Sequence, residues 1–189
     1  MTDAPAALVT PRGGLGPAGR ALATRPCRIA YMGASVTVQK NGYRPRLHEL
    51  LMRHFGQEHE SAMAALGAVG VVSGVMLADE LVVGRELDIC FIEYTSALLV
   101  KRRSVSDAEA AMDGILTKLR AAGISPCVLH LGRDPWPDRS AAVKRAFERA
   151  TARHDVPSID IEYPLRNARH RLPCGDPYSD GVHTTGEGS

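Results

Sequence analysis

One serine and one histidine at opposite ends of the chain are of the types needed for nucleophilic catalysis. Ser35 follows the apolar run Cys27–Met32 after a Gly-Ala step. Asp180 and His183 stand near the other end, with two residues between them. This spacing lets the carboxylate turn back onto the imidazole and fix its tautomer, which leaves the second ring nitrogen free to take a proton. A serine that such a base reaches can act as a nucleophile.

Each of these residues also has an ordinary structural interpretation. Serine is common in turns and at helix starts, and an Asp-His pair at this spacing is common on protein surfaces. A phosphate-binding loop is a third interpretation of 33–37, but Gly-Ala-Ser-Val-Thr lacks the glycines and the lysine of a P-loop. The other histidines mostly fall on expected helix faces or in loops, and His130 ends a predicted strand. Taken singly, neither Ser35 nor the Asp180–His183 pair decides between these interpretations.

Strands and helices are predicted to alternate around these residues. Apolar runs predict strands at 28–32, 61–66, 87–94, 126–131 and 156–161. Helical spacing predicts helices at 43–55, 75–83, 106–122 and 138–154. The alternation predicts a parallel sheet of about five strands with helices on both faces. Ser35 would then lie at the carboxyl edge of the sheet, where open α/β sheets bind their ligands.

Local signals mark the ends of two of these helices. Ser106, with Glu109 three residues later, predicts a capping box at the start of helix 106–122, and Gly123 predicts its end. Gly56 predicts the end of helix 43–55 in the same way. The segment 165–179 is predicted to be an irregular basic loop.

The composition fits one globular domain. The chain has 189 residues, a formal net charge of +2, 44% hydrophobic and 23% charged residues. It has neither the basic field of a nucleic-acid-binding protein nor an apolar stretch of about 18 residues that could span a membrane. Residues 1–26 are rich in Ala, Gly, Pro and Arg, which predicts a flexible extension before a single domain over 27–189.

The four cysteines show neither a metal-binding nor a disulfide pattern. No two of them form a C-x-x-C pair, so neither a metal nor another cofactor is expected. Three of them lie in or beside predicted strands and are expected to be buried and reduced, which favours a cytoplasmic protein. The four are Cys27, Cys90, Cys127 and Cys174.

Five segments, in order along the chain, resemble motifs of the SGNH or GDSL-type hydrolases. Residues 33–37 resemble the nucleophile motif of that family, and residues 180–188 resemble its terminal Asp-Gly-Val-His-Pro-Thr-x-x-Gly. Residues 41–45, 66–70 and 89–94 resemble its Gly-Trp-Arg-Pro segment, its Ile-Gly-Gly-Thr-Gly turn and its strand Val-Phe-Ile-Glu-Phe. The resemblance covers about residues 28–188, and its two end motifs are the most specific.

The resemblance implies a three-layer α/β/α sandwich of the flavodoxin-like SGNH type, and hydrolysis of esters. Ser35 would attack a carbonyl, His183 would take and return the proton, and Asp180 would orient His183. The oxyanion would be held by the backbone N–H groups of Ser35 and Ala68, with Gly67 shaping the second turn.

The chain departs from the family pattern at one oxyanion donor and at its end. The family carries an Asn after its third strand, where this chain has Ala97. Loss of one such donor typically costs about 10²- to 10³-fold in rate. Thr95, Ser96 and Asn41 are the residues that could replace it. The family also continues after its histidine with a closing helix. Either this sequence is a piece of a longer chain, or a partner chain, a second copy or the N-terminal arm covers that face.

Three functions follow from this pattern. The first is a serine esterase or deacylase acting on small O-acyl esters, the second an acyltransferase that uses the same serine. The third is a catalytically weak protein that binds a ligand or partner in the same cleft. Arg44, Trp136 and Glu93 are candidates for substrate binding, and the segment 42–45 suggests a carbohydrate-linked ester by resemblance alone.

Overall fold

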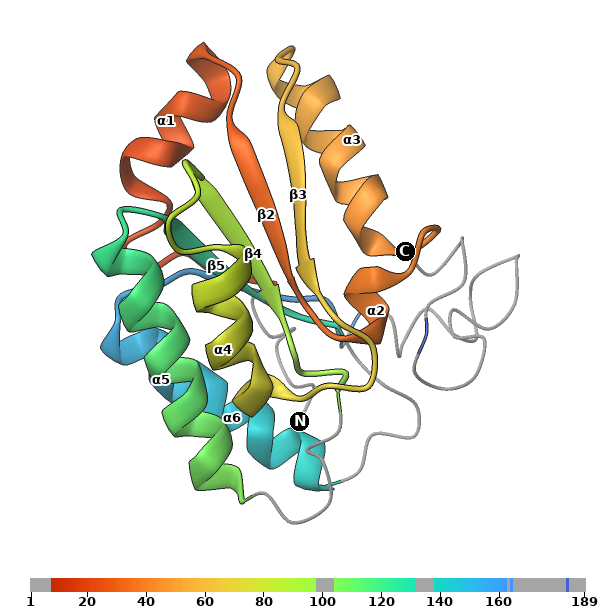
Figure 1. The fold of residues 1–189 in the computed structure, drawn as a ribbon, viewed down its shortest axis with the longest axis vertical. Helices are drawn as coiled ribbons and strands as arrows, with labels where there is room; N and C mark the ends of the chain where they lie inside the picture. Colours follow the sequence, from red (N-terminus) through yellow and green to blue (C-terminus); the bar gives the residue numbers. More distant parts are fainter. Residues whose placement is uncertain (1–7, 98–103, 132–137, 163, 165–182, 184–189) are drawn as a thin grey trace, which may run out of the picture.

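The computed structural model describes residues 8–97, 104–131, 138–162, 164 and 183. Within these ranges one sheet lies between two layers of helices (Figure 1), which confirms the predicted α/β/α sandwich. The strands are β1 (Val9–Thr10), β2 (Arg28–Gly33), β3 (Glu60–Ala65), β4 (Ile89–Glu93), β5 (Ser125–His130) and β6 (Ser158–Asp160). The helices are α1 (Gly16–Thr24), α2 (Ser35–Val38), α3 (Tyr43–Phe55), α4 (Val71–Leu81), α5 (Val105–Ala121) and α6 (Asp138–Arg153).

The sheet reverses its strand order at β2. Its order is β1-β6-β5-β4-β2-β3, and all pairs from β3 to β6 are parallel. The chain passes from β2 to β3 on one side and then crosses to β4 on the other side. Open α/β sheets bind ligands beyond the carboxyl ends of the strands at such a switch point. Ser35 follows β2 and is therefore placed at this position.

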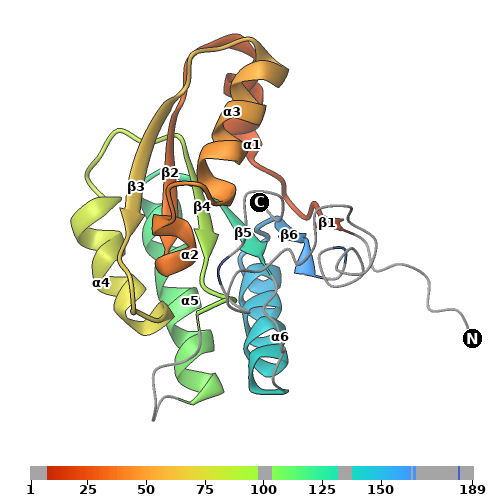
Figure 2. The same ribbon diagram turned by 90° about the vertical axis from the view of Figure 1, so that its right-hand side faces the viewer.

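Two hydrophobic cores lie on opposite faces of the sheet. Every residue of β4 is buried, as expected for a strand covered on both sides. One core joins the sheet to α4, α5 and α6, and the other joins it to α1 and α3 (Figure 2). Cys27, Cys90 and Cys127 are free and buried in these cores, as predicted.

The prediction of a flexible N-terminal extension is wrong for residues 8–26. Here β1 pairs antiparallel with β6 and adds a sixth strand to the sheet. Helix α1 has Pro17 in its first turn, where a backbone N–H would have no acceptor within the helix, so proline is tolerated. The helix buries Ala18 and Leu22. Composition misled because small residues and proline suit a short helix packed closely on a sheet as well as a disordered arm.

Helix α5 begins at Val105, and its N-cap, Ser104, lies two residues before the predicted cap at Ser106. Ser104 Oγ accepts a hydrogen bond from the N–H of Asp107 at 3.0 Å, and the Asp107 carboxylate accepts one from the N–H of Ser104 at 2.8 Å. This capping box replaces the predicted one at Ser106. Glu109 instead forms an ion pair with Arg149 on α6. Acidic side chains thus occur at both candidate spacings, and only the packing of α5 decides between them.

The other predicted strands and helices begin and end within four residues of the predicted bounds. Gly56 and Gly123 have positive φ angles of 64° and 75°, which confirms the predicted ends of α3 and α5. Helix α4 starts at Val71, four residues before the predicted start. The predicted loop at 165–179 lies outside the described residues. None of the helices in the described ranges is both long and apolar enough to cross a membrane.

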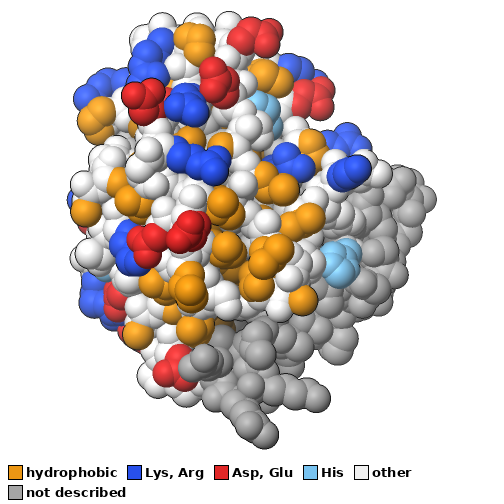
Figure 3. Space-filling view, in the orientation of Figure 1, with side chains coloured by type: hydrophobic (Ala, Val, Ile, Leu, Met, Phe, Trp, Pro, Cys, Tyr) orange, Lys and Arg blue, Asp and Glu red, His pale blue; other side chains and the backbone are white. Residues whose placement is uncertain are grey.

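One edge of the sheet, at β3, carries apolar side chains on the molecular surface. Met63 on β3, Leu66 just after it and Met76 on α4 are all exposed. Hydrophobic side chains gather on this face of the molecule (Figure 3). The apolar edge therefore runs up to the turn that begins at Leu66.

The packing of α1 gives a stability prediction. Leu22 is 3% exposed, so Leu22→Ala is expected to lower the free energy of unfolding by about 3 kcal/mol through the cavity it leaves. Leu8 is 50% exposed, and Leu8→Ala is expected to change it by less than about 0.5 kcal/mol. Urea denaturation of both variants measures this difference, and equal effects would contradict the integration of α1 into the core.

Candidate active site

Ser35 is the first residue of α2, two residues beyond the end of β2. Ala34 precedes it as the N-cap in an extended conformation, with φ −105° and ψ −150°. The first N–H groups of a helix have no acceptor within the helix, so the backbone N–H of Ser35 is available to a ligand. This short helix presents Ser35 at the carboxyl edge of the sheet.

Gly33 is required by close packing. A Cβ atom at this position would lie 2.1 Å from Thr37 Oγ1 and 2.5 Å from the carbonyl oxygen of Glu93. The sequence suggests instead that glycine serves a sharp turn, but Gly33 is not among the residues with positive φ. Only a residue without a side chain lets the turn that carries Ser35 pack against the end of β4.

The glycine-containing turn 66–70 is held beside the Ser35 turn. The N–H of Leu66 donates to the carbonyl oxygen of Gly33 at 3.3 Å, and Ala65 is in register with Gly33. Ala68 has a φ of 62°, a conformation that costs an alanine about 1 kcal/mol and suits glycine better. Ala68 and Gly67 are exposed. The turn therefore lies near Ser35, and the role of the Ala68 N–H as an oxyanion donor stays a prediction.

Tyr43 and Arg44, at the start of α3, contact the end of α2. Tyr43 Oη lies 3.1 Å from Thr37 Oγ1 with both groups buried, and burial raises the pKa of Tyr43 well above its ordinary value. Arg44 Nε donates to the carbonyl oxygen of Thr37 at 3.1 Å. Arg44, predicted to bind substrate, thus contacts the helix that carries Ser35, and substrate binding by its guanidinium stays a prediction.

His183 lies against Ser35 although 148 residues separate them. Its Nε2 atom is 2.9 Å from Ser35 Oγ, and both residues are half-buried. An imidazole nitrogen at this distance can take the proton of a serine hydroxyl. Asp180 and Trp136, the other predicted site residues of the loops, lie outside the described residues.

Glu93 holds the turn that follows β4. Its carboxylate accepts hydrogen bonds from the N–H of Ser96 at 2.8 Å and from Ser96 Oγ at 2.6 Å. Burial raises the pKa of Glu93 to about 7, against the opposing effect of the hydrogen bonds from Ser96 and Thr95. Glu93 has no exposed surface, so its carboxylate cannot contact a substrate in this conformation. The predicted substrate-binding role is therefore replaced by a structural one.

The hydroxyl groups expected to replace the missing Asn are engaged elsewhere. Ser96 Oγ donates to Glu93, and Thr95 Oγ1 lies 2.8 Å from His130 Nδ1. Asn41 is exposed in the connection between α2 and α3, and Ala97 is half-buried without a side-chain donor. The backbone N–H groups and the side chain of Asn41 thus remain the predicted oxyanion donors, and their role stays a prediction. Nothing in the sequence near Thr95 indicates that His130 is its partner.

Comparisons with solved structures find similar folds. A two-domain esterase active on acetylated mannans aligns with a TM-score of 0.73 and 18% identity over 90% of this chain and 47% of that chain. TesA aligns at 0.68 and 14% over 85% and 90%, and the lipase/acylhydrolase from Enterococcus faecalis at 0.67 and 17% over 86% and 89%. This chain therefore spans about half of the two-domain esterase. No family model and no curated protein matches the sequence.

The protein has the fold of the SGNH or GDSL-type esterases and lipases. Several similar structures belong to that group, including a GDSL-like lipase from Parabacteroides merdae with a TM-score of 0.72 and 12% identity. Identities of this size establish the fold alone. Among the described residues, no group of three or more His, Cys, Asp or Glu side chains is placed to bind a metal ion.

The close packing at Gly33 can be tested by adding one methyl group. Gly33→Ala is expected to lower the free energy of unfolding by about 3 kcal/mol, because the backbone oxygen of Glu93 cannot move without shifting β4. Gly114→Ala in α5 is the control, since its Cβ would meet nothing closer than 3.9 Å and alanine favours a helix by about 1 kcal/mol. Similar denaturation midpoints for both variants would rule out the packing argument.

The buried carboxyl group of Glu93 is expected to make stability depend on pH. Its folded pKa of about 7 lies above an unfolded value of about 4.3, so its contribution is fully present below pH ~4.3 and is lost as pH rises through 7. The wild type should lose up to about 3 kcal/mol over this range relative to Glu93→Gln. Urea denaturation at several pH values measures this, with Glu86→Gln, 97% exposed, as the control. Parallel curves for the wild type and Glu93→Gln would show that burial does not perturb Glu93.

Proposed function

We propose that the protein is a serine esterase that hydrolyses small O-acyl esters through Ser35. The observation that supports this most is the 2.9 Å contact between His183 Nε2 and Ser35 Oγ at the carboxyl edge of the sheet. The fold shared with several solved esterases supports the same class of reaction. The position of Ser35 at the strand-order switch also supports the proposal, because open α/β sheets bind their ligands there.

In the proposed reaction, Ser35 Oγ attacks the carbonyl carbon of the ester while His183 Nε2 takes the hydroxyl proton. The tetrahedral intermediate then breaks its C–O bond, and the alcohol leaves with the proton returned by His183. Water attacks the acyl-enzyme in the second half, again with His183 as the base, and releases the acid and free Ser35. We assign Asp180 the role of orienting His183 on the strength of the motif alone.

The negative charge of the intermediate would be held by backbone groups. We assign this role to the N–H groups of Ser35 and Ala68, in the two turns joined through Gly33. Ala97 supplies no side-chain donor, and the hydroxyls of Thr95 and Ser96 are engaged. We therefore expect turnover about 10²- to 10³-fold slower than a site with a complete set of donors would reach.

The substrate class that we propose is an O-acetylated carbohydrate. One similar structure is an esterase active on acetylated mannans and another is an acetyl xylan esterase. Arg44 and Trp136 remain candidates for contacts with the sugar. Ala97 has no side chain that could serve as a third oxyanion donor. This favours one alternative, a weak enzyme that mainly binds a ligand in the same cleft. Transfer of the acyl group to an alcohol instead of water is the other alternative.

Ser35→Ala tests the proposed nucleophile. The variant is expected to lose at least about 10³-fold in hydrolysis of p-nitrophenyl acetate, because no other group forms the acyl-enzyme. A fluorophosphonate probe should label the wild type at Ser35 and leave the variant unlabelled. Ser61→Ala, at an exposed position of β3, is the matched control and should behave as the wild type.

The same assay separates the alternatives. Faster turnover on addition of an alcohol acceptor, with acylated alcohol as the product, would favour the acyltransferase. Folded wild-type protein that is neither labelled nor active would overturn the nucleophilic role of Ser35 and leave only ligand binding.

A further inference from the structure

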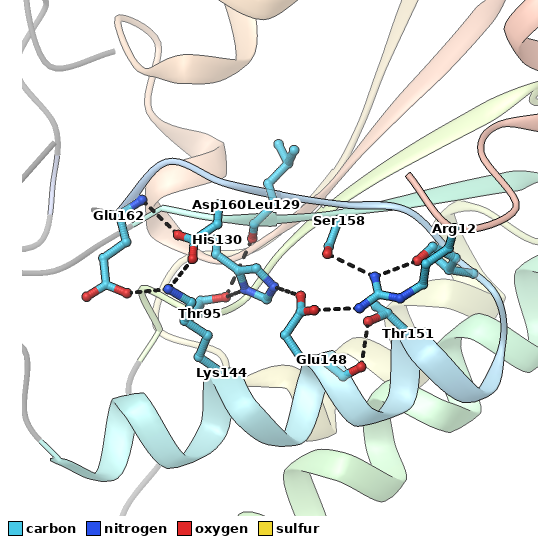
Figure 4. Close-up of polar contacts among 11 residues, drawn as sticks. Arg12, Thr95, Leu129, His130, Lys144, Glu148, Thr151, Ser158, Asp160 and Glu162 are labelled. Atoms are coloured by element: carbon cyan, nitrogen blue, oxygen red, sulfur yellow. Dashed lines mark hydrogen bonds and ion pairs between the residues drawn. The ribbon is translucent and has the colours of Figure 1, made fainter. Parts of the chain in front are cut away.

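A second hydroxyl–imidazole–carboxylate unit lies inside the fold. Thr95 Oγ1 is 2.8 Å from His130 Nδ1, and His130 Nε2 is 2.7 Å from Glu148 Oε1 (Figure 4). The unit has the same chemical order as a catalytic triad, but His130 is 0% exposed and Thr95 is 2% exposed. A substrate cannot reach a hydroxyl group in this position. The unit therefore holds structure in place instead of attacking a substrate.

The hydrogen-bond direction within this unit follows from the charge of Glu148. Burial alone would raise the pKa of Glu148, but hydrogen bonds from His130, Arg12 and Ser158 outweigh it and lower the pKa to about 2. An ionised carboxylate only accepts hydrogen bonds, so His130 Nε2 carries a proton and donates it. His130 Nδ1 and Thr95 Oγ1 then share the hydrogen bond on the other side of the ring. The carbonyl oxygen of Leu129, which also lies near that hydroxyl, is farther away at 3.5 Å.

Arg12 connects this unit to the N-terminal strand. It donates to Glu148 Oε2 at 2.6 Å, to the carbonyl oxygen of Val156 at 2.9 Å and to Ser158 Oγ at 3.0 Å. The unit thus joins four parts of the fold, namely the segment after β1, the end of β5, the middle of α6 and the turn after β4 (Figure 4). Because Arg12 and Glu148 are half-buried, their pairing is less screened by water than a fully exposed ion pair.

The turn that this unit holds stands next to the Ser35 turn. Thr95 follows Glu93 by two residues, and Ser35 follows Gly33 by two residues. Gly33 and Glu93 are in register on neighbouring strands, so the two turns leave the sheet side by side. Glu93 binds Ser96 within the turn, and His130 binds Thr95. The turn 94–97 is therefore fixed by two separate buried groups.

We propose that His130 and Glu148, held by Arg12, are positioning residues that fix the turn 94–97 through Thr95 for catalysis at Ser35. This inference rests on the proposed function. Backbone N–H donors cannot change rotamer as a side-chain donor can. A shift of the neighbouring turn is therefore not compensated at the proposed site. A displacement of about 1 Å at a reacting centre can cost on the order of 10²-fold in rate. The N-terminal strand, through Arg12, is then part of what sets the rate.

Two substitutions at Thr95 test the positioning role. Thr95→Val keeps the shape but removes the hydroxyl, and it leaves His130 Nδ1 without its hydrogen-bond partner. We expect kcat to fall by about 10- to 100-fold while KM changes by less than about twofold, because the turn and not substrate binding is disturbed. Thr95→Ser keeps the hydroxyl and should restore kcat to within about threefold of the wild type.

A pair of neighbouring positions on α6 supplies the matched control. Glu148→Gln offers one acceptor where His130 and Arg12 need two, so it should lower kcat as Thr95→Val does. Arg149→Gln removes an ion pair between Arg149, which is exposed, and Glu109 on α5, and it should keep the wild-type kcat. Hydrogen exchange of the Ser96 amide gives a readout that does not depend on activity. We expect exchange to be at least about 10-fold faster in Glu148→Gln and Thr95→Val only.

The outcomes separate this inference from the proposed function. An active wild type with unchanged kcat and unchanged Ser96 exchange in Thr95→Val overturns the positioning role and leaves the esterase intact. Faster exchange across the whole sheet, without rescue by Thr95→Ser, also overturns it, because the unit would then only stabilise the fold. A wild type that is inactive and unlabelled at Ser35 overturns the proposed function, and with it the catalytic part of this inference.

Discussion

The packing of two backbone segments at Gly33 is the constraint on which the rest of the site depends. Because Gly33 has no side chain, Thr37 Oγ1 and the carbonyl oxygen of Glu93 occupy the space that a Cβ atom would fill. Thr37 carries this constraint to Tyr43 at the start of α3. Glu93 carries it to the turn at Ser96. One close contact thereby sets the relative positions of α2 and the turn after β4, and with them the surroundings of the proposed nucleophile.

Two hydroxyl–imidazole pairs show how burial decides what the same chemistry does. Ser35 and His183 are half-buried at the carboxyl edge of the sheet. Thr95 and His130 make a similarly short contact in the interior, where both side chains contact only other residues of the protein. The groups and distances are similar, so exposure is the property that separates a candidate reactive site from a structural one.

Two glutamates near the carboxyl edge are held in opposite ways. Glu93 is buried among neutral donors, so its pKa is raised to about 7 and its charged form is costly. Glu148 is only half-buried, and hydrogen bonds from His130, Arg12 and Ser158 lower its pKa to about 2. The turn 94–97 is thus tied to one carboxyl group that readily takes a proton and to another that stays charged.

The sequence by itself determined the alternation of strands and helices, the position of Ser35 beyond the first parallel strand and the ends of α3 and α5 at glycine. These features depend on neighbouring residues, so periodicity and turn chemistry are enough to predict them. Only the tertiary structure decided that residues 8–26 form a strand and a helix of the domain, that Glu93 is buried and that His130 joins Thr95 to Glu148. Each of these features depends on contacts between residues far apart in the chain. The order of residues does not give the distance between such segments, which is set only when the sheet forms.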